Sequence, residues 1–236
     1  MTTHVITLMW GTAWERYGEK FVSTFDEYWP GETRLRICTD RDLPTRHRQI
    51  PLESVPGYRS FLKRWDGNPK GEGRESRDRK SVPGKRFWKH DAVKWAPQCL
   101  SWVPLVKGMK DDDIVIWLDA DVETTAKVPP DWGSTLLGRK EVACLLRHDQ
   151  HPEIGFWAAR LNDKTRAMID LSAWLYISDA VFRLPEWHSA FVFGEALART
   201  GPTVANINPT FSRGHCWPKT ALAQYTIHKK GKLKDQ

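Results

Sequence analysis

The stretch HVITLMW, residues 4–10, opens the pattern that decides the fold. It is an apolar run with β-branched members, it ends at Gly11, and it predicts a first strand. Residues 13–29 then carry apolar side chains at helical spacing and stop at Pro30-Gly31, and residues 34–38 predict a second strand. Because strand, helix and strand follow in this order, we expect a parallel sheet with right-handed crossovers.

The rest of the chain continues this α/β pattern. Residues 87–106 form a helical stripe that Pro97 interrupts, so we expect a kink or two short helices there. Residues 114–118 are apolar on both faces, which is typical of a central parallel strand. We expect further strands at 142–146 and 203–207 and helices at 164–175 and 188–198. The predicted fold is one α/β domain with a mostly parallel nucleotide-binding sheet flanked by helices.

The most informative motif is IVIWLDADV, residues 114–122. A buried strand delivers Asp119 and Asp121 at its carboxyl end, and ligands of such sheets bind at that edge. Residues two apart in an extended chain point the same way, so both carboxylates can face one site. Two such oxygens suit a hard divalent cation that keeps open positions for phosphate oxygens. A pair of turn-forming or capping aspartates is the structural alternative.

A second motif, HKKGKLK, covers residues 228–234. Read as H-x-x-G-x-x-K, it offers an imidazole ligand at His228 and a glycine at Gly231 that permits close backbone approach. Lys234 then supplies a counter-charge for phosphate, and a solvated basic tail is the alternative. Beside the two aspartates, the motif indicates a complementary half of one site.

Together these motifs resemble the metal-dependent GT-A-fold glycosyltransferases, and the tail is similar to that of the small retaining enzymes related to glycogenin. The resemblance implies that Asp119, Asp121 and His228 hold Mn²⁺ or Mg²⁺ on the pyrophosphate of a nucleoside-diphosphate sugar, UDP-sugar above all. The residues expected to bind the donor are Asp119 itself, Trp10 and Gly11 as the floor under the nucleotide, Thr39, Asp40 and Arg41 at the end of the second strand, and Lys230, Gly231 and Lys234 on the phosphates. Asp40 is the candidate for the base or ribose edge, and Lys230, Lys234 and Arg41 would offset the diphosphate charge.

The acceptor side is expected between residues 148 and 193. In LPEWHSAFVF, residues 184–193, a turn places Glu186 near a helix N-terminus, where many glycosyltransferases of this fold carry an acidic acceptor-side residue. We expect Glu186 to be the catalytic carboxylate, with Asp149 as its competitor. Residues 148–158 predict either a sugar-binding wall or a plain β-hairpin.

Charge distribution suggests the acceptor. The net charge is +7, and residues 63–90 alone contain ten Lys or Arg and four Asp or Glu, with Trp65, Phe87 and Trp88 interleaved. Such a segment suits phosphate contact and base stacking, so we expect a nucleic acid acceptor, for instance a hydroxylated base in DNA, as phage-type DNA-modifying glycosyltransferases use. Residues 66–86 are nearly free of apolar side chains, which predicts a mobile inserted loop.

This reading divides the single domain into a nucleotide-binding half at 1–122, an acceptor-side half at 123–227 and a phosphate-binding tail at 228–236. The apolar runs are broken by charge before 18 residues, so no membrane insertion is expected. Four scattered cysteines predict reduced, buried thiols in a cytoplasmic protein. Three alternatives stay open: transfer to a glycan, lipid or protein, a metal-dependent nucleotidyltransferase or phosphodiesterase, and a non-catalytic nucleic-acid-binding module.

Overall fold

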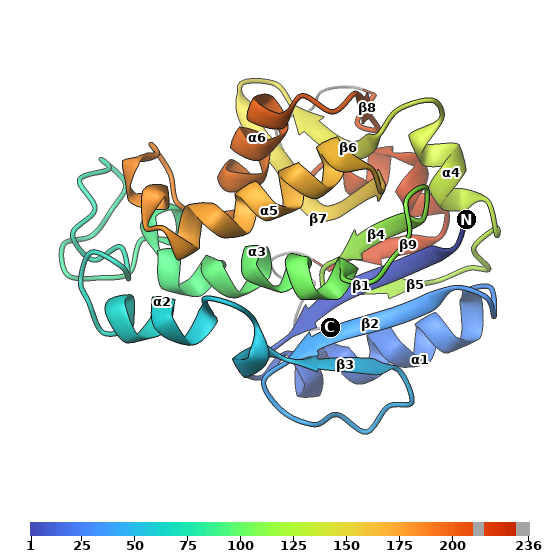
Figure 1. Cartoon of the computed structure of the whole chain (residues 1–236), viewed down its shortest axis with the longest axis horizontal. Helices are drawn as coiled ribbons and strands as arrows, with labels where there is room; N and C mark the ends of the chain where they lie inside the picture. The colour runs from blue at the N-terminus through green and yellow to red at the C-terminus, as the bar shows by residue number, and fades with distance from the viewer. Residues whose placement is uncertain (210–214, 230–236) are drawn as a thin grey trace.

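The fold was analysed in a computed structural model that describes residues 1–209 and 215–229. A seven-stranded sheet runs through the centre in the order β3-β2-β1-β4-β7-β6-β8 (Figure 1). Its strands are β1 (Thr3–Met9), β2 (Arg34–Thr39), β3 (Arg48–Pro51), β4 (Ile114–Leu118), β6 (Val142–Arg147), β7 (Gln150–Arg160) and β8 (Val204–Asn206). Six of them run in one direction and β7 runs against them. The predicted α/β class is therefore confirmed, with one antiparallel strand inserted.

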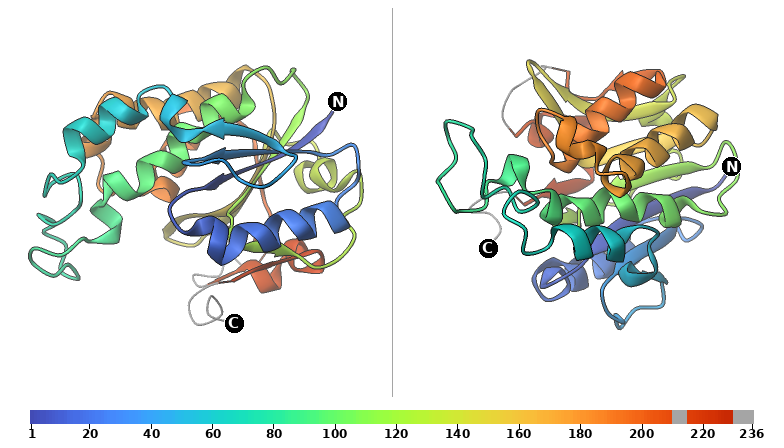
Figure 2. Two further views of the ribbon diagram at one scale, coloured as in Figure 1. Left: turned by 90° about the horizontal axis from the view of Figure 1, so that it is seen from below. Right: turned by 60° about the vertical axis from the view of Figure 1, so that its left-hand side comes forward.

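Helices cover both faces of this sheet (Figure 2). One face packs against α2 (Tyr58–Trp65), α3 (Ala92–Val106), α5 (Asp163–Ile177) and α6 (Ser189–Thr200). The other face packs against α1 (Glu19–Tyr28), α4 (Trp132–Leu137) and the short 3₁₀ turns η5 (Trp217–Lys219) and η6 (Ala221–Gln224). The remaining short helical turns are η1 (Trp14–Gly18, a π-helix that leads into α1), η2 (Leu52–Ser54), η3 (Trp88–His90) and η4 (Ala180–Arg183).

Local sequence signals account for several helix ends. The carboxylate of Asp91 accepts the Lys94 amide and caps α3, and Asn162 forms a capping box with Thr165 at the start of α5. Of the two outcomes expected at Pro97, a break into two short helices is wrong, because α3 is a single helix that contains both Pro97 and Pro104. Eleven of its fifteen residues are buried, so packing outweighs the local cost of the prolines.

A second sheet of two strands was not predicted. β5 (Val122–Thr124) pairs antiparallel with β9 (Thr226–His228), which brings the end of the described chain back beside the end of β4. Val122 lies opposite His228 in this register. The two sequence motifs, more than a hundred residues apart, are therefore joined by backbone pairing.

Residues 66–86 project from one end of the molecule (Figure 1), and part of this segment is buried although it has almost no apolar side chains, while its mobility stays a prediction. Gly71, Glu72 and Gly73 are buried, and Glu72 forms ion pairs with Arg74 and Arg86. The Val93 amide of α3 also donates to the Gly71 carbonyl. A Cβ atom at Gly71 would come within 2.7 Å of the Trp65 carbonyl oxygen, and one at Gly73 within 2.7 Å of the His90 carbonyl, so glycines permit this close backbone packing in the absence of apolar side chains.

All four cysteines are free and buried, as predicted. Among residues 1–209 and 215–229, no helix combines the length and the apolar character that crossing a membrane requires.

The core around α3 centres on Trp102. Its ring is fully buried and packs edge-on against Trp117, Trp157 and Phe193. Trp102→Ala should lower the free energy of unfolding by about 3–5 kcal/mol, measured by urea denaturation, because it leaves a large cavity. The exposed Trp174 is the matched control, and its change to alanine should stay within about 0.5 kcal/mol. Equal effects of the two substitutions would contradict this description of the core.

Candidate functional site

Asp119, Asp121 and His228 converge at the carboxyl end of β4. One possible ligand atom from each lies within 4.8 Å of the others. The two aspartates occupy a turn instead of the extended chain that the sequence suggested, since the Val122 amide donates to the Asp119 carbonyl at 3.0 Å. His228 Nε2 lies 3.1 Å from Asp121 Oδ1. The three residues that the sequence singled out as metal ligands are thus brought together.

The imidazole of His228 is held in place by the backbone of β7. Cys144 lies opposite Trp157 but Leu145 lies opposite Glu153, so β7 bulges over the residues between. Gly155 lies in this bulge, and a Cβ atom there would come within 2.4 Å of His228 Cε1. Its carbonyl also accepts the Asp119 amide at 2.9 Å. A glycine is therefore required at this position of β7, because the strand contacts both the His228 ring and the Asp119 backbone there.

Buried donors orient the carboxylate of Asp119. Trp117 Nε1 donates to Asp119 Oδ1 at 2.9 Å, and Gln98 Nε2 lies 3.3 Å from the same oxygen. The Ser189 hydroxyl donates to Gln98 Oε1 at 2.7 Å, which links α6 to the cluster through α3. Both donors engage one oxygen of Asp119. Burial and then the nearby charge of Asp121 raise the pKa of Asp119 to about 7, a cost that a bound cation would offset.

A cavity of about 310 Å³ opens beside these carboxylates. It is lined by Trp88, Trp95, Gln98, Asp119, Asp121, Arg147, His151, Pro152, Glu153, Ile154, Gly155, His188, Ser189, Ala190 and His228. A second cavity of about 650 Å³ shares Trp88, Arg147 and His151 with it and adds Glu186 and Asp149. The cluster therefore lies in a cleft whose walls come from η3, α3, β7 and the start of α6.

Glu186 lies in a hydrogen-bonded network beside the second, outer cavity. One of its oxygens accepts from Lys89 Nζ and the other lies 2.7 Å from His188 Nε2. Burial raises the pKa of Glu186, but the hydrogen bonds from Lys89 and His188 and the charge of Lys89 outweigh burial and leave the pKa below its ordinary value. Burial lowers the pKa of His188 and of His151 to about 4, so both rings are neutral near pH 7. Glu186 is thus an ionised carboxylate that faces the cleft.

His151, Glu186 and His188 also lie close enough together to share a metal ion. However, His188 Nδ1 lies 3.3 Å from the Phe191 amide at the start of α6, and accepts from it. The proton of the neutral ring must then reside on Nε2, where it points at Glu186. Glu186 therefore accepts hydrogen bonds from the neutral His188 ring and from Lys89, and Lys89 supplies the positive charge that balances it.

Asp149 lies at the outer rim of the cleft. It occupies the turn of the β6–β7 hairpin with φ of 52°, and it is paired with His148 at 2.6 Å. Its side chain is 65% exposed, whereas that of Glu186 is 22% exposed. Residues 148–158 form the turn and most of the second strand of this hairpin, and a sugar-binding role for them stays a prediction.

The predicted nucleotide side lies next to the cluster. Trp10, 39% exposed, shares a cavity of about 190 Å³ with Asp119 and Asp121. The Gly11 amide donates to Asp40 Oδ2 at 2.8 Å, and Arg41 donates to the Gly11 carbonyl. The buried Thr39 hydroxyl donates to the Arg41 carbonyl at 2.9 Å, so Thr39 shapes this turn.

Some predicted residues cannot be placed. Lys230, Gly231 and Lys234 lie outside the described residues, whose last member is Lys229. Of the aromatic residues expected to stack on nucleic acid, Trp88 is exposed, while Phe87 is buried and Trp65 donates to Asp179 at 2.7 Å. Burial makes the expected stacking wrong for Phe87, whereas stacking on the half-buried Trp65 and on Trp88 stays a prediction.

Sequence reasoning missed Gly155, Gln98 and Lys89. A glycine inside an apolar strand and a lone glutamine inside a buried helical stripe were the available signals. The chain matches no protein-family model, and no curated protein is similar to it in sequence.

Proposed function

We propose that the protein is a metal-dependent glycosyltransferase that moves a sugar from a nucleoside-diphosphate sugar to an acceptor hydroxyl. The observation that carries the proposal is the convergence of Asp119, Asp121 and His228 beside a cleft at the carboxyl end of β4. Two carboxylates and one imidazole suit Mn²⁺ or Mg²⁺, and strand carboxyl ends are where α/β sheets bind nucleotides.

A divalent cation held by these residues would act as a Lewis acid on the leaving diphosphate. Trp117 and Gln98 keep the Asp119 carboxylate oriented toward that position. The diphosphate would lie between this cluster and Arg41, and the nucleoside against Trp10 and Gly11. Lys230, Gly231 and Lys234 remain the proposed phosphate contacts of the tail.

Glu186 is the proposed acceptor-side carboxylate. It lines the outer cavity, and Lys89 and His188 keep it ionised. An ionised carboxylate can accept the proton of an acceptor hydroxyl or orient that hydroxyl for attack. Asp149 is the second candidate, since it lines the outer cavity beside Glu186.

The proposed acceptor is a hydroxylated base in nucleic acid. Arg77, Arg79, Lys80 and Lys85 are exposed in the projecting segment, and Lys80 and the exposed ring of Trp88 line the outer part of the cleft. Lysine and arginine side chains that can contact phosphates lie beside a tryptophan ring on which a base can stack, and this combination supports a nucleic acid acceptor. Transfer to a glycan, lipid or protein would leave the donor site unchanged and make these cations unnecessary.

The proposal is tested by a thermal-shift panel of nucleoside-diphosphate sugars with and without Mn²⁺. A donor that binds only the folded protein raises its melting temperature, so we expect a shift that requires both the metal and the nucleotide. Stabilisation by nucleoside triphosphates alone would favour a nucleotidyltransferase. Binding of nucleic acid with no nucleotide effect would favour a non-catalytic module.

Gly155→Ala tests the packing that holds His228. The new methyl group would overlap the imidazole, so His228 must move away from Asp121. We expect Mn²⁺ affinity, measured by titration calorimetry, to fall by about tenfold or more. This is the usual loss when a residue that orients a metal ligand is changed. Gly31→Ala is the control, since a Cβ there meets nothing within 4 Å. Unchanged Mn²⁺ affinity in Gly155→Ala would remove His228 from the proposed ligands.

A further inference from the structure

The two cavities of the cleft meet at three side chains. The cavity of about 310 Å³ contains the candidate metal ligands, and the cavity of about 650 Å³ contains Glu186. Trp88, Arg147 and His151 line both of them. Under the proposed function, on which this step rests, the donor sugar lies beside the metal and the acceptor enters past Glu186, so the new bond forms at this junction. Of the three shared side chains, only His151 can accept a proton near neutral pH.

The ring of His151 is enclosed, yet it makes no hydrogen bond to any described residue. Its side chain is 18% exposed, and its ring centroid lies 4.2 Å from that of His188. Nδ1 lies 3.9 Å from Glu186 Oε2, which is an ion-pair distance and too long for a hydrogen bond. Burial, with the charges of Arg147 and Lys89, lowers the pKa of His151 to about 4 although the charge of Glu186 acts the other way. The ring is therefore neutral near pH 7 and carries a lone pair.

The neighbouring proton acceptors, His188 and Glu186, are already engaged. His188 accepts the Phe191 amide on Nδ1 and donates from Nε2 to Glu186. The second oxygen of Glu186 accepts from Lys89. Glu186 also lines only the outer cavity, whereas His151 lines both. His151 is thus better placed than Glu186 to receive a proton where the donor and the acceptor meet.

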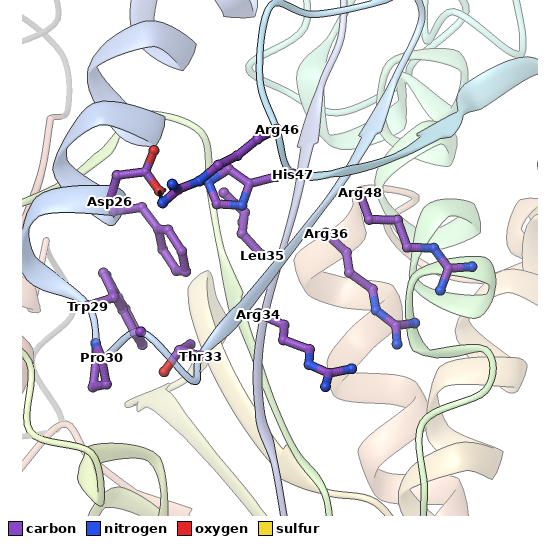
Figure 3. A pocket seen from close by; sticks show the side chains of 12 residues that line it. Asp26, Trp29, Pro30, Thr33, Arg34, Leu35, Arg36, Arg46, His47 and Arg48 are labelled. Atoms are coloured by element: carbon purple, nitrogen blue, oxygen red, sulfur yellow. Dashed lines mark hydrogen bonds and ion pairs between the residues drawn. The ribbon is translucent and has the colours of Figure 1, made fainter.

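A histidine beside a carboxylate does not by itself indicate catalysis. Figure 3 shows a second such pair, in which His47 Nε2 lies 2.9 Å from Asp26 Oδ1. Arg46 binds the same oxygen at 2.9 Å, and the surrounding cavity of about 550 Å³ is lined by none of the candidate metal ligands. The side chain of His47 is 12% exposed, so it resembles His151 in burial. The position of His151 beside the metal ligands distinguishes the two, and His47 provides a matched control.

We propose that His151 accepts the proton of the acceptor hydroxyl and that Glu186 stabilises the charged ring. The acceptor oxygen bonds to the anomeric carbon while the bond from that carbon to the diphosphate oxygen breaks. The electron pair of the broken bond leaves with the diphosphate, and the hydroxyl proton passes to Nε2 of His151. The proton on Nδ1 faces Glu186, whose negative charge balances the imidazolium, and water takes up the extra proton after product release.

The test is chemical rescue of turnover in His151→Ala. Wild type and variant receive excess Mn²⁺, the nucleoside-diphosphate sugar that gives the largest thermal shift, and a DNA duplex that carries hydroxymethylated cytosine. Turnover of the variant should fall by about 10²-fold or more, the scale of losing a positioned base. Added imidazole should enter the space left by the ring and restore part of the turnover. Pyrazole has the same size but is a much weaker base, so it should not restore turnover.

Two controls accompany the rescue. The Mn²⁺-dependent thermal shift by the donor should be nearly the same in His151→Ala and in the wild type, because the candidate metal ligands are unchanged. His47→Ala should retain wild-type turnover, and imidazole should not increase it.

Four results would overturn the role of His151. They are wild-type turnover in His151→Ala, a loss of donor binding in that variant, a loss of turnover that imidazole does not restore, and equal rescue by pyrazole, which would mean that the ring only fills space. A wild type that releases no diphosphate from this donor and acceptor would contradict the proposed function itself, and the role of His151 with it. The two failures are therefore distinguishable.

Discussion

Asp121→Asn should abolish the Mn²⁺-dependent stabilisation by a nucleoside-diphosphate sugar and reduce turnover by more than about 10²-fold. Loss of groups that merely support a metal ligand costs 10–100-fold, and removing the charge of a ligand costs more. Asp121 also orients His228 Nε2 at 3.1 Å, so the substitution disturbs two of the three proposed ligands. Calorimetric Mn²⁺ titration and donor thermal shifts measure the effect.

Asp170→Asn is the matched control, since Asp170 is exposed on α5 and lines neither of the cavities that Asp119 and Asp121 line together. It should leave both metal binding and turnover unchanged. Circular dichroism should show that Asp121→Asn remains folded. An Asp121→Asn protein that binds Mn²⁺ and donor as the wild type does would contradict the proposed metal site.

Glu186→Gln should reduce turnover by about 10²-fold or more while donor affinity stays near normal. The magnitude is that of losing a positioned base or acid. The amide keeps the size of the side chain but cannot accept a proton, and it leaves the Lys89 charge unbalanced. Steady-state kinetics with varied donor and varied acceptor distinguishes an effect on donor binding from an effect on the acceptor.

Asp149→Asn provides the comparison. The exposed Asp149 should contribute little to turnover if Glu186 is the acceptor-side carboxylate. A large loss of turnover in Asp149→Asn, with little change in Glu186→Gln, would assign the role of acceptor-side carboxylate to Asp149.

The alternation of strands and helices was predictable, and the direction of one strand was left open. β1, β2 and β4 have clear boundaries in the sequence, so their places follow from it. β7 begins with Gln150, His151 and Glu153 before its apolar part, and the sequence offered a hairpin there as one of two possibilities. Its direction follows from the short hairpin at Asp149, which leaves no room for a crossover.

The candidate metal ligands were predictable because their residue types are unusual at the end of an apolar strand and near a basic tail. The residues that position these ligands could not be predicted. Gly155 matters because it allows His228 to approach, and Gln98 matters because its two ends meet Asp119 and Ser189. Such roles arise only when distant segments pack together, so a single sequence does not display them.

The projecting segment was misjudged for a related reason. Its sequence has almost no apolar side chains, yet glycine backbone and the ion pairs of Glu72 replace apolar burial. Arg74 and Arg86 consequently balance Glu72, and the cations open to an acceptor are mainly Arg77, Arg79 and Lys80.

The most direct test of the proposed transfer is the product released from a nucleoside-diphosphate sugar in the presence of Mn²⁺ and DNA that carries hydroxylated bases. Glycosyl transfer predicts release of the nucleoside diphosphate in step with acceptor modification, and loss of both when Mn²⁺ is removed with a chelator or when Asp121 is replaced by Asn. Release of a sugar phosphate, with the nucleoside monophosphate either set free or transferred to the acceptor, would contradict it.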